Sequence, residues 1–555
     1  MTSDYMRSRR RQLGVILAII LLLAFAIRGA PLYWSPYPST LDGFGYAALA
    51  RATIDSGSIP LSGRADGLVF TSMLALVSSV LDTDPLRLIQ PLASLVGAIA
   101  CLVGVSVARR AVAETGRLPS IRSHTVAVVT GGLLAVEGLF LRRTSVPDEE
   151  IVGILLTIII TFALHLAYRT GEKRWYGIVG LLLGILPLLH TFTSLIVGLV
   201  VTALTARHVS RTLSVRSLLG GVCLAGGFWA YLAFYYRIVS DILSFTVPYV
   251  NRVVAYPGLF IAWAIVLTVG VVWFQHTSSR IRQVTYLSIV GTFFAVVLVN
   301  AFTPVFPGTA STPPLVLGFV ALLGVVAVAA TASLDVLSSY RGGAVLTALF
   351  AAPAVVIGFS LTASLTPEYF ATAMRAQTFL HFPVLVLSAI TVTRLVSGHN
   401  LGTLHGVLAV VAAALIVLTV VASAPVAFVN MDTGSVPSTT LSSEYEGVTY
   451  AGTYGDQTWA SDHSLTRVGS YIYGANTSVS PVASWLTGGP SPQCLVVSQS
   501  SWTTTGAHLF PSAPETVSEH TYRQWLGSRN VIYTSNGHDS LSVSLPTSET
   551  ERPGC

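Results

Sequence analysis

Charged residues are scarce in this 555-residue chain, at 10% of the sequence, and Lys173 is its single lysine against 30 arginines. Soluble domains carry about 25% charged residues. No CxxC, HExxH, Walker A or GxGxxG pattern governs the sequence, which disfavours an ATP-driven pump, a nucleotide-binding enzyme or a nucleic-acid partner. Hydrophobic residues make up 52%, and apolar runs of about 20 residues alternate with short arginine-bearing links. These features predict an all-α polytopic protein embedded in the lipid bilayer.

Residues 1–424 contain apolar runs for about 13 transmembrane helices. The first run, 13–27, follows a cluster of arginines and has no small-residue cleavage site, so we expect an uncleaved span and a cytoplasmic N-terminus. Residues 31–90 then form a long external loop, in which the apolar run at 67–81 is short for a span. The run at 176–206 is too long for one span, and we expect two short helices that meet near His190.

Residues 425–555 form a different kind of region, which the span count places outside the cell membrane. Residues 426–555 carry 4 basic and 10 acidic side chains, against 27 and 15 in residues 1–424. Alternating runs at 468–473 and 494–498 predict a small extracellular domain with β-strands. Asn476 lies in the N-x-S/T sequon of this region and is a candidate glycosylation site. Cys494 and Cys555 could pair there, but their spacing leaves the question open.

Carboxylates gather at the predicted outer ends of the spans. Asp42 follows the first span, although its Asp-Gly context is also typical of a turn. Asp148 and Glu149 precede the fourth span, where they would orient an acceptor, hold a metal ion or cap the helix. The need for a divalent cation therefore stays open. Asp82-Thr-Asp84 resembles a D-x-D metal motif, but we favour Asp84 as the cap of a helix that starts at Pro85.

Basic side chains at the same predicted surface break the tendency of arginine to lie inside. They are Arg51, Arg64, Arg87, Arg142, Arg143, Arg237, Arg252 and Arg375. Arg142, Arg143 and Arg375 are candidate phosphate ligands, because a guanidinium fork matches phosphate oxygens; anchoring to lipid headgroups is the alternative. His190 and His381 are candidate substrate-binding residues, with packing as the alternative for His190.

Glu137 lies within the third predicted span. An ionisable group is costly there and is usually functional, and an internal pair with an arginine is the alternative.

The arrangement of these features resembles the polytopic C-superfamily glycosyltransferases (GT-C), most closely those that use dolichyl- or polyprenyl-phosphate sugars. The resemblance rests on the first span, Asp42, the long loop and the helix that ends in Arg109-Arg110. It continues through Asp148-Glu149-Glu150 and the helical pair at Gly180–His190, and it covers about residues 12–211. The oligosaccharyltransferase pattern W-W-D-Y-G is absent, and residues 458–463 look like outer domains of membrane proteins from salt-adapted archaea.

The resemblance implies an inverting hexosyltransferase. It would transfer mannose from a dolichyl- or polyprenyl-phosphate donor to a glycan or glycoprotein acceptor of an archaeal surface layer. Because the phosphate is a good leaving group, such a reaction needs one base and cations for the phosphate, and Asp42 is the expected base. A lipid-linked sugar flippase or transporter is the alternative, although the sequence shows no inverted repeat.

Overall fold

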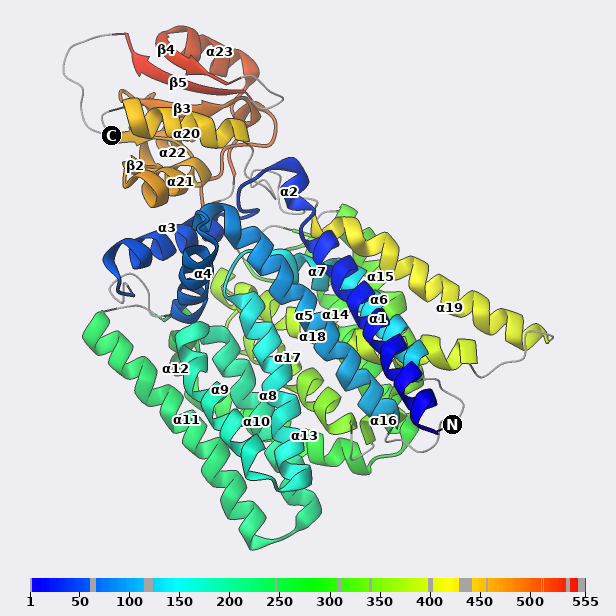
Figure 1. Ribbon diagram of the computed structural model, residues 1–555. Coiled ribbons are helices and arrows are strands. Elements are labelled where there is room, and N and C mark those ends of the chain that lie inside the picture. Colours follow the sequence, from blue (N-terminus) through cyan, green and yellow to red (C-terminus); the bar gives the residue numbers. More distant parts are fainter. Residues whose placement is uncertain are drawn as a thin grey trace.

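A bundle of long helices carries a small mixed domain at one end in the computed structural model of the chain (Figure 1). The structure describes residues 2–59, 66–113, 123–244, 247–307, 309, 311–312, 314–338, 342–397, 403–428, 442–455, 458–510, 512, 514–535, 540–547 and 555. Arg64 lies outside these residues. The chain starts at the end of the bundle away from the mixed domain and finishes in that domain.

Eleven helices in the described part of the chain are long and apolar enough to cross a membrane. They are α1 (Thr2–Arg28), α5 (Pro85–Ala113), α8 (Glu150–Thr170), α10 (Thr191–Thr212), α11 (Val215–Leu243), α13 (Pro257–His276), α14 (Ser279–Phe302), α15 (Pro314–Ala330), α17 (Gly343–Ala363), α18 (Pro367–Ser397) and α19 (Leu404–Ser423). The bent pair α6 (Ser123–Val136) and α7 (Gly138–Ser145) adds a twelfth span. The remaining predicted span is α9 (Lys173–Leu189), which is 17 residues long and is not among these candidates; it meets α10 at His190 as expected. The predicted all-α membrane architecture is confirmed.

The helices differ in how deeply they are buried. Most side chains of α8, α10 and α17 are buried within the bundle, whereas those of α11, α13 and α14 are mostly exposed. The exposed side chains are apolar, as Leu219, Phe234 and Phe302 illustrate. Such a surface is stable against lipid and not against water, so these three helices form a lipid-facing side of the bundle.

The first loop contains three helices: α2 (Pro31–Trp34), α3 (Leu41–Ser56) and α4 (Leu68–Leu81). The 14 residues of α4 are too few to cross a bilayer, which confirms the prediction for this apolar run. Pro85 begins α5, and Asp84 Oδ1 accepts a hydrogen bond from the Leu86 backbone N–H at 2.9 Å. Asp84 also forms an ion pair with Arg51. Asp84 is therefore a helix cap, as its spacing predicted.

The third span bends by 68° between α6 and α7, and we call this bend the elbow. Buried Arg28 donates to the carbonyl oxygens of Leu134 and Ala135 at 3.2 and 3.3 Å, at the end of α6. Buried Glu137 accepts hydrogen bonds from the first backbone N–H groups of α7. A helix break inside a bilayer leaves backbone polar groups unpaired, so these two charged side chains stabilise the elbow.

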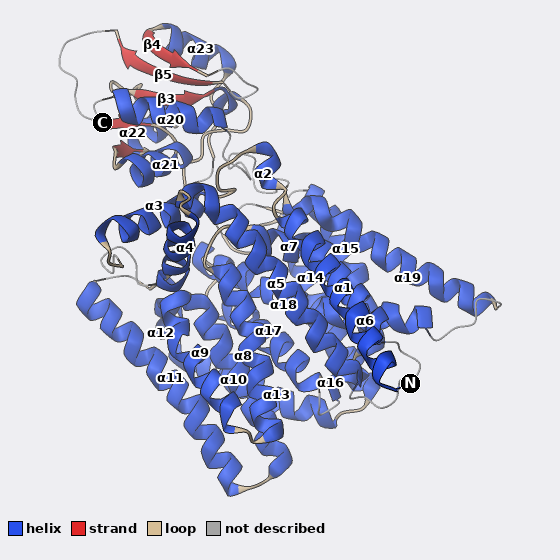
Figure 2. Ribbon diagram, in the orientation of Figure 1, coloured by secondary structure: helices blue, strands red, loops and turns tan. Residues whose placement is uncertain are grey.

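The C-terminal domain contains a five-stranded sheet with the order β2-β1-β3-β5-β4 (Figure 2). Its strands are β1 (Thr458–Ala460), β2 (Asn476–Ser478), β3 (Val496–Gln499), β4 (Arg529–Thr534) and β5 (Leu541–Pro546). The pairs β1–β2 and β1–β3 are parallel, and the pairs β3–β5 and β4–β5 are antiparallel. Four helices accompany the sheet: α20 (Ser442–Tyr454), α21 (His463–Tyr473), α22 (Ser480–Leu486) and α23 (Glu519–Gly527).

The predicted strand content of this domain is confirmed at 496–499, but the prediction for 468–473 is wrong. These residues lie in α21, whose first turn Asp462 caps by accepting from the Leu465 N–H at 3.0 Å. Leu465 and Val468 are buried three residues apart, which is helical spacing, so the cap and this face outweigh the local alternation. The disulfide that the sequence left open joins Cys494 to Cys555.

The C-terminal domain packs directly on the first loop. Phe44 and Ala47 of α3 share one buried apolar cluster with Trp459, Leu465 and Val468 of the domain. Figure 1 shows α3 and α21 side by side at this junction. Because α3 also carries Asp42, the domain is fixed close to a candidate site residue.

Gly138 gives a stability prediction for the elbow. A Cβ atom there would fall on the carbonyl oxygen of Ser423, whereas a Cβ at Gly132 of α6 would meet nothing within 4 Å. Gly138→Ala should therefore destabilise the protein by about 1–3 kcal/mol, as overpacking does. Thermal unfolding of the purified protein should show a lower midpoint for Gly138→Ala and an unchanged or higher one for Gly132→Ala. Equal midpoints would contradict this account of the elbow.

Candidate functional site

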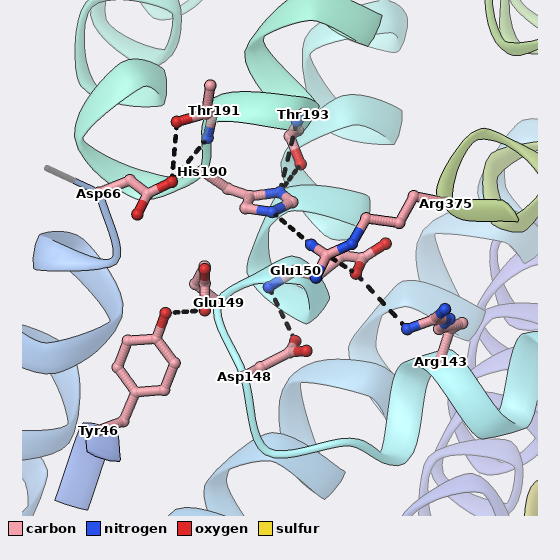
Figure 3. Close-up of polar contacts among 10 residues, drawn as sticks. All are labelled: Tyr46, Asp66, Arg143, Asp148, Glu149, Glu150, His190, Thr191, Thr193 and Arg375. Carbon is pink, nitrogen blue, oxygen red and sulfur yellow. Dashed lines mark hydrogen bonds and ion pairs between the residues drawn. The ribbon is translucent and has the colours of Figure 1, made fainter. Parts of the chain in front are cut away.

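Side chains from five elements converge at the end of the bundle that carries the C-terminal domain (Figure 3). They come from α3, from α7 and the following turn, from the start of α8, from the α9–α10 junction and from α18. Asp148, Glu150 and His190 lie at or beside the end of a helix, and Arg375 lies eight residues into α18. The site therefore lies at one face of the membrane domain and not at its centre.

Glu150 is the centre of this cluster. It is the first residue of α8 and its side chain is 1% exposed. Its Oε2 atom lies 3.8 Å from Arg143 Nη1 of α7 and 3.5 Å from Arg375 Nη1 of α18. Neither carboxylate oxygen has a hydrogen bond from any described residue. Two cations from different helices thus neutralise a buried carboxylate without bonding to it closely.

His190 fixes Arg375 from the other side. The residue is extended between α9 and α10, and its Nε2 atom lies 3.2 Å from Arg375 Nη1. A guanidinium group only donates hydrogen bonds, so Nε2 is the acceptor. Nδ1 lies 2.7 Å from the Thr193 hydroxyl and accepts from the Thr193 backbone N–H at 3.4 Å. These contacts at the start of α10 hold the ring in place, and the ring orients Arg375.

A second cation lies beside Arg375. Both Arg375 and Arg252 lie over the ring of Tyr249, with guanidinium carbons 5.5 and 4.7 Å from its centroid. Arg252 belongs to α12 (Pro248–Ala255) and donates to the Thr372 hydroxyl of α18 at 2.7 Å. The sequence placed Arg252 only among the outer arginines, because nothing in its neighbourhood indicates that α12 folds back onto α18.

The acidic residues come together as the sequence predicted. Asp148 Oδ1 accepts from the Glu150 backbone N–H at 2.9 Å, so it caps the start of α8, and Glu149 accepts from the Tyr46 hydroxyl. The pKa of Asp148 is raised well above its usual range, first by burial and then by the negative charges of Glu150, Glu149 and Asp42. Asp42 itself is exposed in the first turn of α3. Its charge therefore acts on Asp148 from the solvent side.

Three predicted residues lie at the edge of this cluster or beyond it. Arg142 is half-buried next to Arg143 on α7. His381 lies further along α18, where its Nδ1 atom is 3.5 Å from Glu137 Oε1, so the internal partner of Glu137 is this histidine. Asn476 is exposed at the start of β2. Among the described residues, no group of three His, Cys, Asp or Glu side chains is arranged to hold a metal ion, and a divalent cation stays a prediction.

Asp66 links the first loop to the site, and no motif in the sequence marks this residue. Its Oδ2 atom accepts from the Thr191 hydroxyl at 2.8 Å and from the Thr191 backbone N–H at 3.3 Å. The Gly67 N–H donates to the Leu189 carbonyl at 2.8 Å. These contacts join the loop to the α9–α10 junction on both sides of His190.

Comparison with solved structures identifies the fold class. The structure is similar to the oligosaccharyltransferase of Archaeoglobus fulgidus in its apo form, with a TM-score of 0.56 and 14% identity over 88% of this chain and 70% of that one. The same enzyme tethered to an acceptor peptide containing the NVT sequon gives a TM-score of 0.50, with 14% identity over 88% and 69% of the two chains. No family model and no curated protein matches the sequence. At this identity the likeness shows the fold, which is of the GT-C type as expected.

A polar cluster in the C-terminal domain adjoins Asp42. Asp462 is buried, accepts from Trp502 Nε1 at 3.2 Å, and burial raises its pKa to about 6. His508 Nδ1 lies 2.9 Å from the Ser464 hydroxyl, and burial followed by His463 lowers its pKa to about 4. Burial and then Arg467 lower the pKa of His463, whereas the carboxylate of Asp42 raises it. The electrostatic interaction between Asp42 and His463 therefore links the C-terminal domain to the site.

Asp462 and His508 have opposite effects on stability between about pH 4 and 6. Folded Asp462 binds more protons than the unfolded chain in this window, so its contribution falls as pH rises, by about 3 kcal/mol in all. Folded His508 binds fewer, so its contribution rises with pH. Relative to wild type, the unfolding midpoint of Asp462→Asn should rise from pH 4 to 6, and that of His508→Asn should fall. Tryptophan fluorescence during heating measures both; parallel curves for all three proteins would contradict the assignment.

Proposed function

We propose that the protein is a membrane glycosyltransferase that transfers one hexose, mannose, from a dolichyl- or polyprenyl-phosphate donor. The acceptor is a glycan or glycoprotein at the outer face of an archaeal cell membrane, as in surface-layer glycosylation. The observation that carries this proposal is the pair of guanidinium groups, from two spans, that converge on one buried carboxylate oxygen. The GT-C-type fold and its likeness to an archaeal oligosaccharyltransferase support it.

The arginine pair is suited to a phosphate monoester or diester. Charge-assisted N–H···O bonds are about 2.7–2.9 Å long, so contacts of 3.5 and 3.8 Å leave hydrogen-bond donors of both arginines for a ligand. The side chains of Arg143 and Arg375 are 34% and 30% exposed, whereas Glu150 is buried. Three arginines, Arg143, Arg375 and Arg252, thus gather at the position of a phosphate, while Asp148 and Glu149 also act on Arg375 through their charge.

Asp42 is the base in this proposal. The acceptor oxygen attacks the anomeric carbon as the bond from that carbon to the phosphate oxygen breaks, and the lipid phosphate leaves with the electron pair. The acceptor proton passes to the carboxylate of Asp42, and the single displacement inverts the configuration. Asp148 is the poorer candidate, because it is buried and its Oδ1 atom is engaged in capping α8. If a divalent cation takes part, Asp148 and Glu149 are its candidate ligands.

The location of the site agrees with a lipid-linked donor. Spans α7, α8 and α18 bring their charged residues together (Figure 3). A lipid phosphate at headgroup depth would lie at this end of the spans. We place this face and the C-terminal domain outside the cell and the N-terminus in the cytoplasm, from the arginine distribution and the number of spans. The C-terminal domain, packed on α3, would then border the acceptor path.

Kinetics with a polyprenyl-phosphate hexose and the full-length protein in lipid nanodiscs test this function. Arg375→Ala should raise the KM for the lipid donor roughly tenfold to hundredfold, because charge-assisted contacts contribute about 1.5–3 kcal/mol. Arg375→Lys should recover part of the loss, since ammonium lacks the fork. Arg237→Ala is the matched control, as Arg237 pairs with Asp241 on lipid-facing α11.

The same assay separates the role of Asp42 from that of the arginines. Asp42→Asn should lower kcat by about 100-fold or more, because the amide cannot take a proton. Asp55→Asn, on the same helix and exposed, should leave kcat unchanged. Absence of hexose transfer by the wild type, or an Arg375→Ala variant altered only in acceptor dependence, would refute the proposal.

A further inference from the structure

The elbow contains a buried pair of ionisable side chains that the proposed reaction does not use. Glu137 is fully buried, and its Oε1 lies 3.5 Å from His381 Nδ1 of α18. Its two oxygens also accept from the Leu139 and Phe140 N–H groups at 3.3 and 2.7 Å. A neutral side chain such as serine or asparagine is enough to cap a helix. The capping role therefore leaves the buried charge and its histidine partner unexplained.

The pair joins the same two helices that carry the arginines of the candidate site. On α7, Arg143 follows Glu137 by six residues, and on α18, Arg375 precedes His381 by six residues. Six helical residues span about 9 Å. The Glu137–His381 pair and the Arg143–Glu150–Arg375 contacts are thus two polar links between α7 and α18, about 9 Å apart along each helix.

Other contacts hold α7 against helices that do not carry the site. Arg28 of α1 donates to the Thr144 hydroxyl from Nε at 3.0 Å, and the Gly138 N–H donates to the Ser423 hydroxyl at 3.0 Å. Towards α18, the rings of Phe140 and Phe382 pack 6.2 Å apart. Ring packing is non-directional, whereas the Glu137–His381 contact is a polar contact that joins α7 directly to α18 at the elbow.

We propose that Glu137 and His381 are positioning residues: their polar contact sets the separation of Arg143 and Arg375 for the phosphate of the lipid donor. This inference rests on the proposed function. Loss of the pair lets α18 shift against α7, so that the two guanidinium groups no longer match the oxygens of one phosphate. Displacements of about 1 Å at a distance from the chemistry can change rates by about 100-fold.

The amide variants of His381 distinguish positioning from simple packing. An asparagine nitrogen lies close to the place of imidazole Nδ1, the atom that faces Glu137, whereas a glutamine nitrogen lies close to that of Nε2. His381→Gln should raise the donor KM about tenfold and leave the acceptor KM and the unfolding midpoint near wild type. His381→Asn should recover most of the donor affinity. Glu137→Gln, which keeps an oxygen for the cap, should behave as His381→Gln does.

Exposed His405 at the start of α19 offers a matched control, since His405→Gln makes the same chemical change away from the elbow. Coupling to the arginines gives the second test. In an Arg375→Ala background the phosphate no longer bridges two cations, so His381→Gln should add little to the donor KM. A full additional tenfold loss there would mean that His381 acts independently of the arginine pair and would overturn the proposal.

Binding of polyprenyl monophosphate to the full-length protein in nanodiscs separates this inference from the function on which it rests. The inference predicts binding by the wild type, weaker binding by Arg375→Ala and by His381→Gln, and recovery by His381→Asn. Weaker binding by Arg375→Ala with unchanged binding by His381→Gln would overturn the positioning role and leave the proposed function standing. Absence of binding by the wild type would overturn both.

Discussion

The buried carboxylate of Glu150 is the constraint around which the membrane domain is arranged. A carboxylate without a partner in an apolar bundle is strongly destabilising, and here two arginines from α7 and α18 neutralise it. This requirement brings three helices together at one level, and His190 and Tyr249 hold Arg375 in place. Because the ion contacts are long, the interaction that stabilises the fold also keeps hydrogen-bond donors for an anion. Stability and the proposed binding role therefore depend on the same three side chains.

The polar groups of the bundle are concentrated where a helix breaks or ends. At the elbow, Arg28 and Glu137 satisfy the backbone groups that a bend of 68° exposes. At the other end of the spans, α3 shares its apolar face with the C-terminal domain, and the charge of Asp42 acts on Asp148. The lipid-facing helices carry almost none of this chemistry. The proposed reaction fits such a division, because a lipid donor would need an apolar wall and its phosphate a charged end.

Hydropathy alone predicted the spans, the short helix α4 and the break at His190, because about 20 apolar residues are needed to cross a bilayer. The topology inferred from the sequence also predicted one common region for six candidate residues, which are Asp42, Asp148, Glu149, Arg143, Arg375 and His190. The sequence does not show which of the three consecutive acidic residues is the central one. In the structure, α8 begins at Glu150, so that this side chain is buried in the bundle and Asp148 caps the helix. Partners distant in sequence, such as Glu137 and His381, or Arg252 beside Arg375, follow from tertiary packing that no local pattern records.

The location of a bound lipid phosphate tests the central claim most directly. A cryo-EM structure of the full-length protein with polyprenyl monophosphate should place the phosphate between Arg143 and Arg375. Its oxygens should lie about 2.7–2.9 Å from nitrogens of both side chains, with Glu150 behind them. A phosphate bound elsewhere on the bundle, or held by only one of these arginines, would contradict the account.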